Sequence, residues 1–116
     1  MREIVQSYQQ AHEKTTELRR QLDGVEKSSA ARYGLAREFA QSEFNEKQLL
    51  ESLAAALGAT LDAEMNSWLG MSLANDENTS DEELRELYTE NGLSVDQIDA
   101  AIALRPWFMS DFDAHL

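Results

Sequence analysis

The chain has 116 residues, of which 42% are hydrophobic and 28% are charged, and its formal net charge is −12. A chain of this length fits one domain, and its apolar content is enough to build a core, which argues against disorder throughout. Cysteine is absent, which excludes a disulfide framework, a thiol nucleophile and a thiolate metal site. Because no apolar run suits a signal peptide or a bilayer span, we expect a cytoplasmic protein without membrane association.

The negative charge is concentrated in the second half of the chain. Residues 1–58 carry eight Lys or Arg and nine Asp or Glu, whereas residues 59–116 carry two against thirteen. The second half therefore projects a negative field that repels phosphate and attracts basic surfaces. An acidic surface that serves only to keep the chain in solution is the alternative interpretation.

The pattern along the chain predicts an all-α fold, a small bundle of about five or six helices in a single domain over 1–116. The only proline is Pro106, and no alternating strand pattern of useful length appears. The expected parts are a heptad helix over 1–27, central helices over 28–74, an acidic helix pair over 80–105 and a C-terminal turn over 106–116.

The first helix repeats apolar or small residues at steps of four and three, as in a coiled-coil seam. These residues are Ile4, Tyr8, Ala11, Thr15, Leu18, Leu22 and Val25. The seam predicts a homodimer, with Ile4, Tyr8, Ala11, Leu18 and Leu22 as the dimerisation residues. An antiparallel helix pair within one chain would satisfy the same pattern.

The central residues contain several helix boundary signals. A helix is expected from Ser29 to Glu43, and Asn45 followed by Gln48 predicts a second helix start with a capping box. If that cap is not used, the two helices merge. Gly58 is placed to end the helix, and a further amphipathic helix is expected over 61–74.

The acidic helix pair matches the spacing of a helix-turn-helix motif. Ser80 and Ser94 are placed as N-caps of its two helices, and Gly92 lies at the turn between them. In a DNA-binding motif of this kind the second helix contacts phosphates and base edges through basic or amide side chains. Here acidic residues dominate, and only Arg85 and Arg105 lie nearby, so direct DNA binding is not expected.

These observations predict a non-catalytic protein that binds a partner protein, as a small acidic regulator, inhibitor or adaptor of the kind common in bacteria and their phages. The partner would carry a basic surface, as a nucleic-acid-binding protein does. The expected partner-binding residues are Glu82, Glu83, Glu86, Glu90, Asp96, Asp99, Trp107 and Phe108. Large aromatic residues are common interface anchors, although in a small chain they also build the core.

Three alternative functions remain open. A DNA mimic would present the same carboxylates as a substitute for a phosphate array. A structural or assembly chaperone would use the heptad seam and the aromatic residues. A DNA-binding regulator would need basic residues of the first half, namely Arg19, Arg20, Arg32 and Arg37.

The residues that could support catalysis or metal binding are few. The only histidines are His12, near Glu13 and Glu17, and His115, and neither forms a His-Glu-x-x-His motif. A calcium loop starting at Asp76 fails because its sixth position is not glycine. The sequence also offers no nucleophile elbow or Gly-rich phosphate loop. We therefore expect no enzyme activity, no cofactor and no metal.

Overall fold

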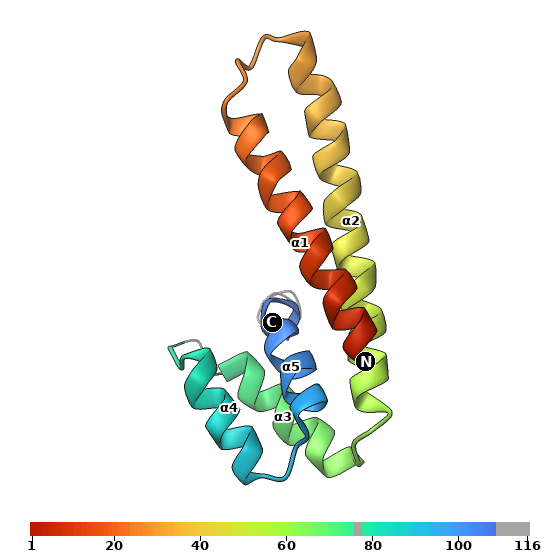
Figure 1. The fold of residues 1–116 in the computed structure, drawn as a ribbon, viewed down its shortest axis with the longest axis vertical. Coiled ribbons are helices and arrows are strands. Elements are labelled where there is room, and N and C mark those ends of the chain that lie inside the picture. Colours follow the sequence, from red (N-terminus) through yellow and green to blue (C-terminus); the bar gives the residue numbers. More distant parts are fainter. Residues whose placement is uncertain (76–77, 109–116) are drawn as a thin grey trace.

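The computed structural model describes residues 1–75 and 78–108, and these are arranged as helices without strands (Figure 1). The helices are α1 (Arg2–Asp23), α2 (Ala30–Gly58), α3 (Ala63–Asn75), α4 (Asp81–Glu90) and α5 (Val95–Ala103). Residues 105–108 are also helical. The predicted all-α fold with five or six helices is confirmed.

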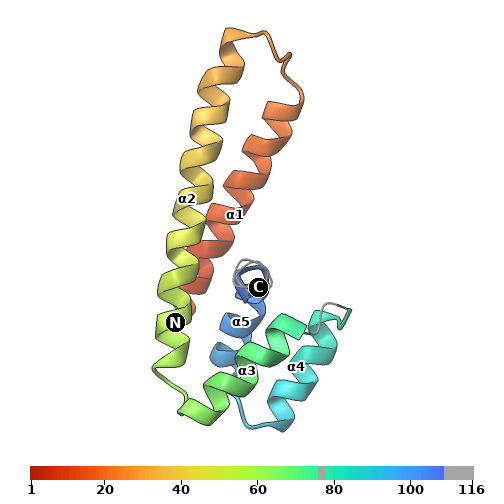
Figure 2. The same ribbon diagram turned by 180° about the vertical axis from the view of Figure 1, so that it is seen from behind.

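Helices α1 and α2 form a long antiparallel pair, which we call the hairpin, and the three shorter helices gather at one end of it (Figures 1 and 2). We call α3, α4 and α5 the acidic lobe. The molecule measures 52 × 29 × 25 Å along its principal axes, because the hairpin extends well beyond the lobe. One hydrophobic cluster runs through both parts, from Val5 in α1 to Leu104 after α5.

The heptad seam of α1 packs against α2 of the same chain. Tyr8 and Leu18 are buried, while Ile4, Ala11 and Leu22 are half-buried. The antiparallel pair within one chain is thus the arrangement that the structure adopts. A homodimer remains a prediction, but the hydrophobic residues of α1 do not require one to be covered.

The prediction of a separate helix starting at Asn45 is wrong, because α2 continues without a break from Ala30 to Gly58. No Gly or Pro interrupts the sequence between Leu35 and Leu57, so the backbone loses no hydrogen bond by continuing. The face towards α1 is also continuous: Ser42 and Leu50 are buried along it. Ser29 is the N-cap that is used, and its side chain accepts a hydrogen bond from the Ala31 backbone N–H.

A polar contact lies inside the hairpin. The Thr15 hydroxyl donates to the Ala11 carbonyl, and the hydroxyls of Thr15 and Ser42 are 2.5 Å apart. Since a hydroxyl has one proton, Ser42 is the donor in the bond between the two. Both side chains are buried and satisfied, so this layer of the hairpin is held by hydrogen bonds rather than by apolar packing alone.

Capping residues define the two helices of the predicted helix-turn-helix. The Ser94 hydroxyl and the Gln97 side chain form the predicted reciprocal capping box at the start of α5. Ser80 caps α4 by accepting from the Glu83 backbone N–H. Gly92 has φ of 86°, a left-handed conformation that glycine adopts without strain, and it turns the chain between the helices.

The lobe has the most completely buried part of the core. Leu84, Tyr88 and Leu104 are fully buried, and the Tyr88 ring meets the Trp68 ring of α3 edge-on with centroids 5.7 Å apart. Short helices of this kind are marginal in isolation, so packing supplies most of their stability. None of the helices in the described part of the chain combines the length and apolar character that a bilayer crossing requires.

Candidate partner-binding surfaces

The outer side of α4 carries a row of exposed carboxylates. The Leu84 and Tyr88 side chains of α4 point into the core. The acidic residues on the other side of the helix are exposed. We call this surface the acidic face and define it as Glu82, Glu83, Glu86, Glu90 and Asp96, the last of these at the start of α5. Within 1–75 and 78–108, none of the five forms an ion pair.

Both cationic residues of the lobe are bound to other carboxylates. Arg85 donates to Asp99 at 2.8 Å, and Arg105 donates to Asp81 at 2.6 Å and to the Thr79 carbonyl at 2.8 Å. Asp99 differs from the other predicted acidic residues because Arg85 compensates its charge, and its role in partner binding stays a prediction. The face itself keeps its negative charge uncompensated.

Helix α5 occupies the middle of the molecule. It packs against α1 and α2 on one side and against α4 on the other. Ala100 and Ala101 are fully buried, and Ile98 is 4% exposed. In a DNA-binding helix-turn-helix the exposed side of the second helix enters the major groove, and the exposed residues of α5 include Val95 and Asp96, which offer no positive charge to DNA.

The two predicted aromatic anchors also pack inward rather than beside the acidic face. Trp107 is half-buried against the hairpin, and Phe108 is half-buried with its ring 3.5 Å from where a Cβ of Gly70 would lie. They hold the C-terminal end of the described chain against α2 and α3. The predicted partner-binding set is therefore divided between two regions of the molecule.

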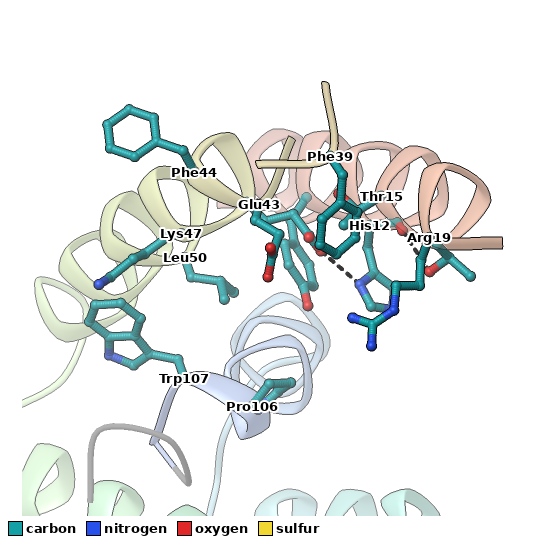
Figure 3. Close-up of a pocket in the computed structure, with 13 residues that line it drawn as sticks. His12, Thr15, Arg19, Phe39, Glu43, Phe44, Lys47, Leu50, Pro106 and Trp107 are labelled. Carbon is teal, nitrogen blue, oxygen red and sulfur yellow. Dashed lines mark hydrogen bonds and ion pairs between the residues drawn. The ribbon is translucent and has the colours of Figure 1, made fainter. Parts of the chain in front are cut away.

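The structure contains a surface that the sequence did not reveal, an open groove between α1, α2 and residues 106–107 (Figure 3). Its volume is about 670 Å³. Tyr8, Phe39, Leu50 and Trp107 supply apolar surface, whereas the polar lining residues are His12, Thr15, Thr16, Arg19, Glu43, Glu46 and Lys47. Phe44 lies at the groove edge with its ring directed away from the other residues (Figure 3).

The groove has a mixed electrostatic character. His12 Nδ1 lies 2.7 Å from Glu46 Oε1, so the carboxylate partner of His12 comes from α2 and not from its sequence neighbours Glu13 or Glu17. Burial and the negative charge of Glu46 raise the pKa of the Tyr8 phenol. The Arg19 guanidinium lies 5.5 Å from the centre of the Phe39 ring, within cation–π range.

One further charged cluster lies on α1 beside the groove. Arg20 donates two hydrogen bonds to Glu17, and Gln21 donates a third. The hydrogen bonds from Arg20 and then Gln21 lower the pKa of the Glu17 carboxyl to about 2. The cluster lies on an exposed helix surface, where i,i+3 and i,i+4 pairs are common.

The groove lacks the arrangement of a nucleophilic triad. A triad needs a hydroxyl or thiol bonded to the second ring nitrogen of the histidine. No described residue makes such a bond to His12 Nε2, since the Thr16 hydroxyl donates to the His12 backbone carbonyl. Across the described ranges, no three His, Asp or Glu side chains gather where they could hold a metal ion.

Several predicted features lie outside the described residues. These are the first positions of the rejected calcium loop, Asp76 and Glu77, and residues 109–116 of the predicted C-terminal turn, which include His115. Comparisons of the chain with protein-family models, curated proteins and solved structures found no match. The geometry and charge of the described residues are therefore the basis for a functional proposal.

Proposed function

We propose that this chain is a non-catalytic interaction protein whose acidic face binds a basic surface on a partner protein. The observation that carries the proposal is the pairing of charges in the lobe. Arg85 and Arg105 compensate Asp99 and Asp81, and the five carboxylates of the acidic face are left exposed without a cation. A solvated surface of one charge on a rigid helix attracts and orients an oppositely charged partner.

The arrangement favours recognition of a surface rather than of a small molecule. Glu82, Glu86 and Glu90 recur every four residues along α4, which spaces their backbones by about 6 Å each. They lie on a convex helix, whereas small-molecule sites are concave and mostly apolar. Val95, which is 71% exposed beside Asp96, adds an apolar contact at the edge of the face.

A DNA mimic is a narrower version of the same proposal. A regular row of carboxylates along one helix can occupy a groove that normally binds phosphates, in which case the partner would be a nucleic-acid-binding protein. The two versions differ in one result. A mimic competes with DNA for the partner, and an adaptor or regulator that binds another basic surface does not.

The exposed residues of α5 argue against the helix-turn-helix regulator, because Val95 and Asp96 give the helix that would read DNA no positive charge to bind phosphates. A structural or assembly chaperone would instead use the apolar lining of the groove, including Phe39 and Trp107. Binding through that lining would depend weakly on salt, whereas binding through exposed carboxylates weakens as salt rises.

The test compares capture of partner proteins by three forms of the chain. The acidic-face variant replaces Glu82, Glu83, Glu86 and Glu90 with Gln, which removes four charges and keeps the side-chain size. The matched control replaces four exposed acids of the hairpin with Gln, namely Glu3, Glu13, Glu26 and Glu38. Retained proteins are identified by mass spectrometry at low and high salt.

We expect the unaltered chain and the hairpin control to capture the same basic proteins. The acidic-face variant should fail to capture them, and high salt should release them. Each such partner is then tested for competition by double-stranded DNA. Capture that survives the acidic-face substitutions and high salt would contradict the proposal and favour the groove. Equal loss in both variants would show that only net charge matters, which also contradicts a specific face.

A further inference from the structure

An open recess lies where the start of α3 meets the turn between α4 and α5, at the end of the molecule opposite the tip of the hairpin (Figures 1 and 2). Its volume is about 230 Å³, and its lining residues are Asp62, Glu64, Met65, Trp68 and Asn91. Typical small-molecule sites are larger, at about 300–1,000 Å³. The recess therefore has room for a single side chain rather than for a whole ligand.

The wall of the recess is apolar and held in place from behind. Trp68 and Met65 are partly buried and pack against the hydrophobic core. The Trp68 ring meets the fully buried Tyr88 ring edge-on, with centroids 5.7 Å apart. Because this contact already orders the Trp68 ring, a bound group does not have to immobilise it, which lowers the entropic cost of binding.

The polar side chains of the recess offer acceptor oxygens. Asp62 Oδ1 caps α3 by accepting from the Met65 backbone N–H at 2.7 Å, which leaves its second oxygen free of that bond. Asn91 Nδ2 donates to the Leu87 carbonyl at 2.7 Å, so its donor group is already used. The Glu64 carboxylate is exposed and forms no ion pair within 1–75 and 78–108. A ligand that suits this lining is a donor of hydrogen bonds.

The recess also lacks a cation of its own. The sequence contains no Lys, Arg or His between Lys47 and Arg85, and the lining includes none. The two arginines of the lobe, Arg85 and Arg105, are bound to Asp99 and Asp81, which do not line the recess. The negative charge of Asp62 and Glu64 is therefore complementary to a positively charged group from outside the chain.

We propose that this recess binds an arginine side chain from the basic surface of the partner protein, an inference that rests on the proposed function. A guanidinium group has five donors in a planar fork that matches carboxylate oxygens, and its plane stacks on aromatic rings. Glu64 and Trp68 are four residues apart on α3, so they are neighbours on the helix surface and one guanidinium can contact both. A lysine would reach the carboxylates but would not stack in this way.

The recess continues the acidic face at one end. Asn91 directly follows Glu90, which is the last residue of α4 and a member of the face. The convex row of carboxylates attracts and orients the partner, whereas a recess with an aromatic wall can enclose one anchor residue. Trp and Arg are the residue types in which interface binding energy is often concentrated. The two surfaces thus have different parts in binding the same partner.

The first experiment titrates the unaltered chain with the peptide acetyl-Gly-Arg-Gly-amide. NMR of the nitrogen-15-labelled chain follows the indole N–H signals of Trp68 and Trp107, which a Trp107→Phe variant assigns. We expect a saturable shift of the Trp68 signal with a dissociation constant on the order of millimolar, because one side chain makes few contacts. The Trp107 signal should stay in place. No saturable shift of Trp68, or an equal shift of Trp107, would overturn the inference.

Two further probe peptides test which property of arginine the recess recognises. Citrulline in place of arginine keeps the planar shape and removes the charge, so that peptide should not saturate the Trp68 signal. Lysine in place of arginine keeps the charge, and its peptide should bind about threefold more weakly because the stacking contact is lost. Equal binding of either peptide and the arginine peptide would contradict an arginine site.

The second experiment repeats the titration with a recess variant that carries Asp62→Asn and Glu64→Gln. The replacement at position 62 keeps an oxygen that can cap α3, so the helix start is preserved. We expect binding of the arginine peptide to weaken about fivefold, since two partly solvated ion pairs are lost. The matched control carries Glu13→Gln and Glu38→Gln on the hairpin, where both residues are exposed. Equal weakening in the two variants would overturn the inference.

Partner capture separates this inference from the proposed function. The recess variant is compared with the acidic-face variant for each basic partner that the unaltered chain retains. Loss of capture in the acidic-face variant with full capture by the recess variant would leave the proposed function standing and overturn the arginine site. Saturable binding of the arginine peptide at Trp68, together with capture that survives the acidic-face substitutions, would overturn the proposed function alone. Reduced capture by both variants is the result that we expect.

Discussion

The hairpin and the acidic lobe are both helical, but they differ in surface charge and in the side chains that they bury. The hairpin leaves Tyr33 and Phe44 exposed, buries a polar pair at Thr15 and Ser42, and has nearly balanced charge. The lobe buries Leu84, Tyr88 and Leu104 completely and has a large excess of acidic residues on its surface.

Helix length explains the difference. Helices of 22 and 29 residues contribute many backbone hydrogen bonds and need only a narrow line of contact. Helices of 9 to 13 residues depend on tertiary packing, so the lobe relies on buried side chains such as Leu84, Tyr88 and Leu104 for its stability. Both regions leave two large apolar side chains exposed, Tyr33 and Phe44 in the hairpin and Met71 and Val95 in the lobe, so the two surfaces differ in charge.

The largest effect expected from this comparison concerns the core. Leu84→Ala in the lobe should lower the free energy of unfolding by about 3 kcal/mol, because a fully buried leucine leaves a cavity. Leu22→Ala in the hairpin should cost about 1 kcal/mol, since that side chain is only half-buried. Urea unfolding of both variants measures the two values. Equal losses would show that the burial of the side chain does not set the cost of its removal.

A smaller effect concerns the two arginines of the lobe. The Arg105 side chain is 15% exposed, so Arg105→Met should cost about 2 kcal/mol by removing charge-assisted hydrogen bonds to Asp81 and Thr79. Arg85→Met should cost about 0.5 kcal/mol, because its ion pair with Asp99 is a surface pair. Thermal and urea unfolding of both variants at low and at high salt measures the two stability losses. A larger loss for Arg85→Met would contradict this order.

The smallest effect is a pH dependence in the hairpin. The pKa of Tyr8 is raised above 10.0 by burial and by Glu46, so the folded chain holds the phenol proton more tightly than the unfolded chain. The resulting stability is fully present below pH 10 and is lost as pH rises through the folded pKa. Tyr8→Phe should therefore lose less stability than the unaltered chain between neutral pH and pH 11. Parallel stability curves for the two proteins would refute the contribution of Tyr8.

Local signals predicted the helices of the lobe well and those of the hairpin less well. The Ser80 and Ser94 caps and the Gly92 turn were correctly placed, because a cap depends on residues within one helical turn. The same reasoning placed a false start at Asn45. A capping signal inside a sequence that can continue as helix is overridden when the apolar face on both sides of it meets one partner helix.

The candidate sites divide in the same way. The exposed carboxylates of α4 followed from their spacing along one helix, whereas the compensation of Asp99 by Arg85 and the groove around His12 did not. No pattern near His12 indicates that Glu46, 34 residues away, supplies its partner. Predicting such a contact requires knowledge of how two helices lie relative to each other, and the periodicity of a sequence does not contain that information.

The sequence by itself determined the helical class, most of the helix boundaries and the concentration of acid in the second half, because these depend on composition and on neighbours within a few residues. The tertiary structure decided that α1 pairs with its own α2, that α5 packs against α1, α2 and α4, and which carboxylates remain without a cation. The physical reason is that an amphipathic helix specifies only that its apolar face must be covered. The surface that covers it is determined by packing between residues far apart in the chain.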